Sequence, residues 1–269
     1  MKSKSFPKRV LGHPLLVVAA AMFGSPCEAA AVDTELVLLV DAQTYSQSDF
    51  ILILDSIASS FEQQAFQDAV IHGSLGKMAA TVILFNAPGE QVGTPWIELS
   101  SNLDLNNFAQ SVRAIAYPNQ GGNVSYSTAI STAAAQLDSN QFTGTTRQIT
   151  MIDDATGFYE AGAAATLAAR NAALATSADV INAIVFDAQY RESAVQAFYN
   201  ANIVSPGGAL SVVSTPQGGA KTSLQIQSVI SSVVGTVSQP TVAATAAVPE
   251  SSSSILLGLG SLLAFRRRR

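Results

Sequence analysis

The chain has 269 residues, of which 48% are hydrophobic and one is a cysteine, and its formal net charge is −5 at pH 7. That length and apolar content suffice for one domain with a substantial core. Between residues 32 and 250 the charge is more negative, because 18 acidic side chains face only six basic ones and leave −12. The basic side chains are scattered singly and such a surface repels phosphate backbones, so we expect no nucleic-acid partner.

The amino terminus has the pattern of a secretory signal peptide. A basic segment over residues 2–9 precedes an apolar segment over residues 11–23, and three alanines at 29–31 offer a small-residue cleavage site. We therefore assign residues 1–31 to a signal peptide and predict export across the inner membrane. Cys27 lies before the cleavage site, so the mature chain is expected to have no disulfide, thiol nucleophile or thiolate metal site.

After residue 31, apolar runs typical of buried strands alternate with apolar residues at helical spacing. Ser46 and Asp49 have the spacing of a capping box before a helix that extends toward Val70. The expected strands span residues 36–40, 78–85, 96–99, 149–152, 180–186 and 210–214. The expected later helices span residues 103–116, 127–137, 160–178, 191–200 and 224–234.

This alternation predicts an α/β fold. Strands separated by helices favour a Rossmann-like, mostly parallel central sheet of about six strands, with helices on both faces and functional loops at the carboxyl ends of the strands. The strand at 96–99 follows the strand at 78–85 within hairpin distance, so we expect this pair to be antiparallel, at an edge of the sheet. The domain is assigned to residues 32–238, and a small-residue linker to residues 239–247.

The end of the chain has the order of a processing signal. In sequence order it consists of Val248, Pro249 and Glu250, four serines, an apolar run over residues 255–265, and Arg266, Arg267, Arg268 and Arg269. Residues 248–269 thus resemble the PEP-CTERM sorting tail of Gram-negative bacteria, which an exosortase-type protease is thought to recognise and cleave. The resemblance implies a protein handled at the cell surface or in the extracellular matrix. One position departs from it, because Ser251 stands where the tail usually has a second proline.

The length of the apolar run favours a transient signal over a permanent anchor. Eleven residues at the helical rise of about 1.5 Å cover roughly 17 Å, whereas a hydrocarbon core is about 30 Å thick. The four arginines would hold the far end of the run on the cytoplasmic side. An ordinary C-terminal membrane anchor is the alternative, since short spans occur with local thinning of the bilayer.

Residues 32–41, Val-Asp-Thr-Glu-Leu-Val-Leu-Leu-Val-Asp, resemble the first strand of von Willebrand factor A-like domains. Residues 142–147 before the fourth strand and the turn at 206–208 before the last agree with this, and the similarity to an uncharacterised group of secreted bacterial A-domains covers nearly all of residues 32–238. The resemblance implies the von Willebrand factor A-type fold. It also implies a metal-ion-dependent adhesion site at one end of the sheet, where hydroxyl and carboxylate oxygens hold magnesium.

The ligands that this site requires are only partly present. In the motif Asp-x-Ser-x-Ser the aspartate is Asp41, but Gln43 and Tyr45 replace the serines; Val124 replaces the threonine, and Asp154 matches the later aspartate. Two carboxylates without their hydroxyl partners make a weak site for magnesium or calcium. We therefore expect a vestigial, metal-independent site in which Asp41 and Asp154 face a common crevice.

We interpret the protein as a non-enzymatic, surface-associated domain of adhesion type that binds a protein or a polysaccharide without a cofactor. One alternative is a divalent-metal-dependent module that uses Asp41 and Asp154. Replacement ligands would come from nearby polar side chains, namely Gln43, Ser125 or Asp153. A second alternative is a hydrolase of the extracellular matrix. It is disfavoured because the mature chain has one histidine, His72, which we expect to cap a helix. The common pairs of nucleophile and base therefore cannot be assembled from the residues present.

Overall fold

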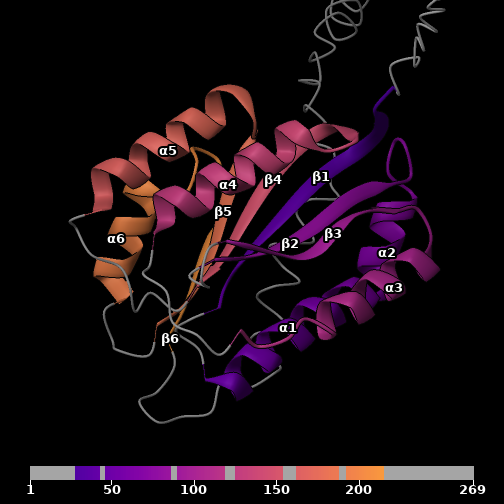
Figure 1. Ribbon diagram of the computed structural model, residues 1–269, viewed down its shortest axis with the longest axis horizontal. Coiled ribbons are helices and arrows are strands. Elements are labelled where there is room, and N and C mark those ends of the chain that lie inside the picture. The colour runs from indigo at the N-terminus through magenta and orange to yellow at the C-terminus, as the bar shows by residue number, and fades with distance from the viewer. Residues whose placement is uncertain are drawn as a thin grey trace, which may run out of the picture.

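The computed structural model describes residues 28–42, 46–85, 90–118, 125–153, 162–187 and 192–214. They form a six-stranded sheet with helices on both faces (Figure 1). The strands are β1 (Ala30–Asp41), β2 (Met78–Phe85), β3 (Gln91–Leu99), β4 (Phe142–Asp153), β5 (Val180–Asp187) and β6 (Leu210–Ser214). The predicted α/β fold with a mostly parallel sheet is confirmed.

The order of the strands in the sheet is β3-β2-β1-β4-β5-β6. β1 pairs in parallel with β2 on one side and with β4 on the other, and β5 pairs in parallel with β4 and β6. β3 pairs antiparallel with β2 at one edge, as the short connection between them predicted. The carboxyl ends of the five parallel strands therefore meet at one end of the sheet, which is where open α/β sheets carry their binding loops.

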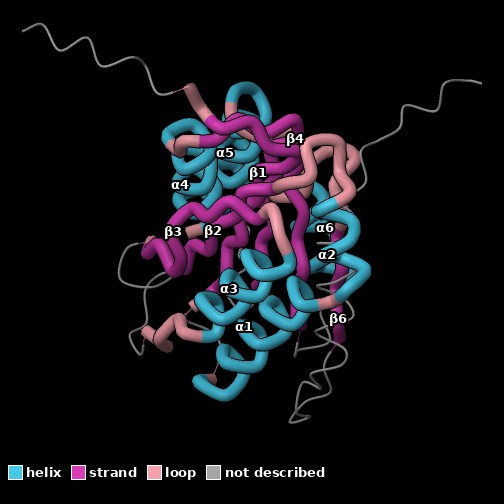
Figure 2. The backbone as a smooth tube through the Cα atoms, turned by 90° about the vertical axis from the view of Figure 1, so that its right-hand side faces the viewer, coloured by secondary structure: helices cyan, strands magenta, loops and turns pink. Residues whose placement is uncertain are grey.

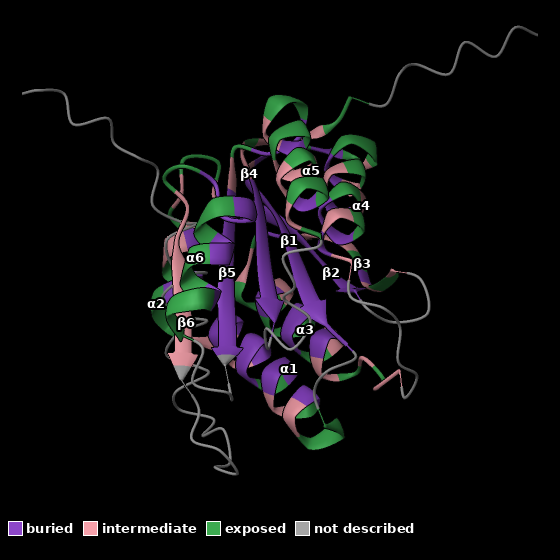
Figure 3. Cartoon of the chain, turned by 90° about the vertical axis from the view of Figure 1, so that its left-hand side faces the viewer, coloured by how far each residue is buried: buried purple, intermediate pink, exposed green. Residues whose placement is uncertain are grey.

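Two layers of helices cover the sheet. One layer consists of α1 (Gln47–Glu62), α2 (Gln64–Ile71) and α3 (Asn102–Arg113), and the other of α4 (Tyr126–Ser139), α5 (Ala163–Thr176) and α6 (Glu192–Asn202). Figure 2 shows α4 and α5 on one side of the strands and α1 and α3 on the other. In β1, Leu38 and Val40 face the α1–α3 layer and Val37 and Leu39 face the α4–α6 layer. The central strands are thus buried on both faces (Figure 3).

The first helix of the chain begins as predicted but ends earlier. The Ser46 side chain caps it and accepts a hydrogen bond from the backbone N–H of Asp49 at 3.1 Å, which confirms that the helix starts after Ser46. The single helix expected toward Val70 is wrong, because the backbone is extended at Gln63 and separates α1 from α2. Tertiary contacts explain the break: the Gln67 side chain donates to the carbonyl of Phe61 and to Asn106 of α3.

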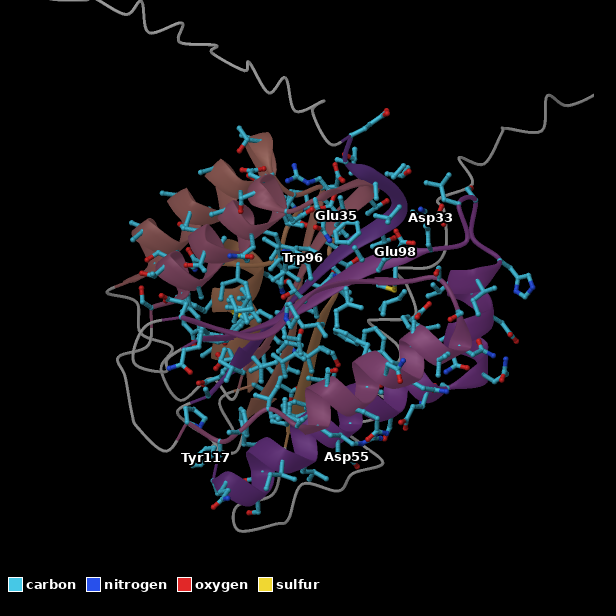
Figure 4. The ribbon with its side chains drawn as sticks, turned by 45° about the vertical axis from the view of Figure 1, so that its right-hand side comes forward. Asp33, Glu35, Asp55, Trp96, Glu98 and Tyr117 are labelled. Atoms are coloured by element: carbon cyan, nitrogen blue, oxygen red, sulfur yellow. The ribbon has the colours of Figure 1, made fainter. Side chains whose placement is uncertain are left out.

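β1 and β4 begin earlier than their apolar runs indicated, because a buried carboxylate joins them. Glu35 of β1 is 1% exposed and accepts hydrogen bonds from the backbone N–H of Gly144 at 2.5 Å and from the Asn140 amide at 2.6 Å. A Cβ at position 144 would lie 2.9 Å from the Glu35 nitrogen, so the approach requires glycine. Figure 4 shows Glu35 at the end of the sheet opposite Tyr117.

The pairing of β1 with β4 starts with Ala30 opposite Phe142. The strand therefore includes two residues of the segment assigned to the signal peptide, and the position of cleavage stays a prediction. The predicted helix at 224–234, the linker, the sorting tail and the apolar segment at 11–23 lie outside the described residues. Within the part of the chain that is described, no helix combines the length and the apolar character needed to cross a bilayer.

Candidate functional site

Two buried aspartates lie side by side at the carboxyl end of the sheet. Asp41 is the last residue of β1 and Asp153 the last of β4, and they are 0% and 1% exposed. Val40 lies opposite Ile152 in the parallel pairing, so the next residue of each strand is Asp41 and Asp153. Because side chains alternate along a strand, both carboxylates face the α4–α6 layer.

The structure thus places Asp41 beside Asp153, the residue before its predicted partner Asp154. Asp154 lies outside the described residues, as do Gln43, Tyr45 and Val124. The expected crevice shared by Asp41 and Asp154 therefore remains a prediction. Asp153, which the sequence suggested only as a source of replacement oxygens, is the carboxylate that the described residues place beside Asp41.

Two tyrosine hydroxyls converge on one oxygen of Asp153. Tyr126, the first residue of α4, donates to Oδ2 of Asp153 at 2.7 Å, and Tyr199 of α6 donates to the same oxygen. The two hydroxyl oxygens are 3.2 Å apart. Three elements distant in sequence therefore meet at this carboxylate: the end of β4, the start of α4 and the middle of α6.

The surroundings of the two phenols are apolar and closely packed. Tyr199 is fully buried and Tyr126 is 5% exposed. The Tyr126 ring lies against three aromatic rings, with centroid separations of 6.3 Å to Phe85, 5.9 Å to Phe198 and 5.9 Å to Tyr199. Buried tyrosines usually place the hydroxyl on a polar partner, and here both place it on the same one.

Burial raises the pKa of both phenols far above the ordinary value, and the negative charge of Asp153 raises it further. Asp41 contributes in the same direction to the pKa of Tyr126, in agreement with its position beside Asp153. The two hydroxyls therefore keep their protons across the physiological pH range. They act at this site as hydrogen-bond donors and not as phenolate ligands.

The described residues alone do not complete a site for a divalent cation. No three histidine, cysteine, aspartate or glutamate side chains among them gather closely enough to hold a metal. Oδ2 of Asp153 already accepts two O–H donors, and the Ser125 hydroxyl caps α4, where it accepts from the backbone N–H of Thr128 at 3.3 Å. Magnesium requires several oxygen ligands in near-octahedral geometry, which this arrangement of the described side chains does not supply.

Sequence reasoning did not find the tyrosine pair. Tyr126 directly precedes the helix predicted at residues 127–137, and Tyr199 follows Val195 and Phe198 at the spacing of an apolar helix face, so neither tyrosine stood out. The available signal was weak: one tyrosine at the start of the helix that precedes β4 and one on the helix that follows β5. His72, by contrast, lies where it was expected, exposed at the end of α2, with its Nδ1 2.8 Å from the carbonyl oxygen of Asp68.

A surface groove lies on the outer side of α1 and α3. It has a volume of about 340 Å³ and is lined by Ser48, Ile51, Leu52, Leu54, Asp55 and Arg113. Arg113 closes one side of it through ion pairs with Asp55 at 2.8 Å and Glu62 at 2.5 Å. The hydrogen bond from Arg113 lowers the pKa of Glu62, and the same bond raises that of the guanidinium, so both groups are charged at neutral pH.

The sheet order, the single antiparallel edge strand and the two helical layers are those of the von Willebrand factor A-type fold. The chain belongs to the family described as "Protein of unknown function (DUF1194)", whose model matches residues 31–221. That match contains the six helices and the six strands described above, apart from Ala30 at the start of β1. No curated protein sequence matches the chain.

Solved structures share the fold at low sequence identity. The pilus adhesin SpaC from Lactobacillus rhamnosus GG in its open conformation superposes with a TM-score of 0.54 and 11% identity over 77% of this chain and 30% of that one. Proximal thread matrix protein 1 from the mussel byssus gives 0.51 and 12% over 77% and 48%. The chain spans less than half the length of the first four such structures.

Proposed function

We propose that the protein is an exported, surface-associated binding domain of adhesion type, which holds a protein or a polysaccharide at the carboxyl end of its sheet without a divalent cation. The observation that carries this proposal is the state of Asp153: its buried carboxylate accepts hydrogen bonds from two protonated tyrosines. Oδ2 of this carboxylate is thereby satisfied within the protein. The fold supports a binding role, since SpaC, which shares it, is a pilus adhesin.

The proposal includes a non-enzymatic role. Among the described side chains, Asp153 is engaged by two donors and His72 lies exposed at a helix end on another part of the surface. A hydrolytic site requires a base within hydrogen-bond reach of a nucleophile or of a water molecule, together with groups that stabilise the transition state. Turnover of a matrix polymer that disappears in Asp41→Ala and Asp154→Ala variants would replace this proposal with the hydrolase alternative.

Export and processing by an exosortase-type protease belong to the same proposal and depend on the sequence of the two ends. The basic and apolar start of the chain, the Val248–Glu250 signature and the terminal arginines support it. Intact-mass analysis of the protein recovered from its host tests both ends together. We expect a mass that lacks residues 1–31 and the apolar run at 255–265; a mass that retains the apolar run would favour a permanent membrane anchor.

Binding without a cation has a direct test. The purified protein is presented to the polysaccharide fraction and to the surface-protein fraction of its host, each immobilised, in excess EDTA and in millimolar magnesium or calcium chloride. We expect the same affinity under all three conditions for the fraction that binds. Binding that is lost in EDTA and in an Asp41→Ala variant would show the metal-dependent adhesion module instead.

A further inference from the structure

The buried carboxylate of Asp153 requires compensation, because a carboxylate removed from water is costly unless hydrogen-bond donors or a positive charge face it. Here Oδ2 of Asp153 receives O–H donors from Tyr126 of α4 and Tyr199 of α6. The two helices are separated in sequence by more than fifty residues, so the carboxylate joins parts of the chain that no local interaction connects.

We propose that the hydroxyls of Tyr126 and Tyr199, and not a divalent cation, compensate Oδ2 of Asp153, and that this three-residue cluster fixes α4 and α6 against the end of β4. This inference rests on the proposed cation-independent function and gives it a structural basis. It assigns the two tyrosines a positioning role, since they hold the starts of the binding loops in one arrangement without contacting a ligand.

At Oδ2 of Asp153 the geometry favours the two hydroxyl donors over a cation. A magnesium ion bound to Oδ2 would lie about 2.1 Å from that oxygen. The Tyr126 hydroxyl oxygen is already 2.7 Å from Oδ2, and the two hydroxyl oxygens are 3.2 Å apart. A cation on Oδ2 would therefore compete with both donors. Each displaced hydroxyl would then be left in an apolar environment, because Tyr199 is fully buried and Tyr126 nearly so.

The cluster also connects the two carboxylates. Asp41 ends the strand next to β4 and faces the same helical layer as Asp153. The Phe85 ring, at the end of β2, packs on the Tyr126 ring. Removal of the hydroxyl of Tyr126 is therefore expected to loosen the carboxyl ends of β4 and its neighbours together, without altering the amino end of the sheet, where Glu35 and Gly144 join β1 to β4.

A double-mutant cycle on the full-length protein tests the inference. The variants are Tyr126→Phe, Tyr199→Phe, Asp153→Asn and the combinations of each tyrosine change with Asp153→Asn, with Tyr117→Phe as the matched control. Tyr117 is also a partly buried tyrosine near this end, but it packs on Phe50 of the opposite layer. We expect each single cluster variant to lower Tm by about 3–10 °C, and each combination to lower it less than the sum of its two changes.

Titration with manganese chloride, followed by calorimetry and by Tm, supplies the second readout. The wild-type protein is expected to give no binding heat and no shift in Tm. Additive effects in the cycle, or a wild-type Tm that rises with manganese and fails to rise in Asp153→Asn, would overturn the inference. If a combined variant does not fold, the manganese titration of the wild type and of Asp153→Asn still tests the inference. If the double-mutant cycle shows the expected coupling but the wild-type protein binds neither host fraction, that result would count against the proposed function and not against this inference.

Discussion

The hydroxyl of Tyr126 donates a 2.7 Å hydrogen bond to Asp153 and so joins the first residue of α4 to the last residue of β4. The bond is buried, and its acceptor is a carboxylate. Hydrogen bonds to charged groups contribute more to stability than bonds between neutral groups, typically about 1.5–3 kcal/mol. This relationship leads to the first of four predictions.

Replacement of Tyr126 by phenylalanine removes one donor from Asp153 and keeps the ring that packs on Phe85 and Phe198. We expect the free energy of unfolding to fall by about 1.5–3 kcal/mol, because the carboxylate loses a buried donor and the cavity left is small. Urea unfolding followed by circular dichroism measures it. A loss below about 0.5 kcal/mol would mean that water replaces the hydroxyl without cost.

Replacement of Glu35 by glutamine weakens the junction between the amino ends of β1 and β4. The side chain is 1% exposed and its two oxygens accept from Gly144 and Asn140. An amide has only one acceptor oxygen and presents an N–H₂ group to one of these donors, so we expect a loss of about 1–3 kcal/mol in unfolding free energy.

The matched control for Glu35 is Glu98→Gln on β3, whose carboxylate pairs with Lys77 at 3.4 Å and is 36% exposed. Exposed ion pairs contribute about 0–1 kcal/mol, so this change is expected to have little effect on urea unfolding. Equal losses for the two variants would contradict a special role for the buried carboxylate.

Replacement of Gly144 by alanine tests the same junction by steric means. The added Cβ would lie 2.8 Å from the carbonyl oxygen of Thr146 and 2.9 Å from the Glu35 nitrogen, and both are backbone atoms that cannot move aside individually. We expect a destabilisation of about 1–3 kcal/mol, measured as a lower midpoint in urea. Gly162→Ala is the control, since its Cβ meets nothing within 4 Å, and should change stability by less than about 1 kcal/mol.

The fourth prediction concerns acid. The hydrogen bond from Arg113 lowers the pKa of Glu62 from its ordinary 4.5, so the folded state binds this proton more weakly than the unfolded state. The resulting stability is fully present above about pH 4.5 and is lost as the pH falls through the lowered pKa. Arg113→Met should therefore cost on the order of 1 kcal/mol at pH 7, where the pair is partly exposed to solvent, and less at pH 3.

The measurement is the unfolding free energy of wild type and Arg113→Met in urea across this pH range. Lys77→Met is a suitable control, because its partner Glu98 lies at 3.4 Å on a more exposed surface. A difference between wild type and Arg113→Met that stays constant from pH 7 to pH 3 would show that Arg113 stabilises the α1–α3 contact by packing of its stem and not by charge.

Much of the fold could be predicted because it depends on local patterns. The run from Met78 to Phe85 is apolar on both faces of the strand and has the bounds that were expected. Ser46 and Asp49 stand at the spacing that caps a helix, and α1 begins between them. The break at Gln63 was missed because the apolar spacing continues through it, from Phe61 to Phe66, whose rings pack at 5.0 Å across the break.

The sequence alone determined the alternation of strands and helices, the antiparallel edge pair and the position of Asp41 at the end of a buried strand, since each depends on residues close together in the chain. Only the tertiary structure decided that Asp153 is the described carboxylate beside Asp41 and that Tyr126 and Tyr199 meet on it. Those contacts join residues 27 and 46 positions apart, which depends on how strands pair and helices dock, and no periodicity within one element encodes that.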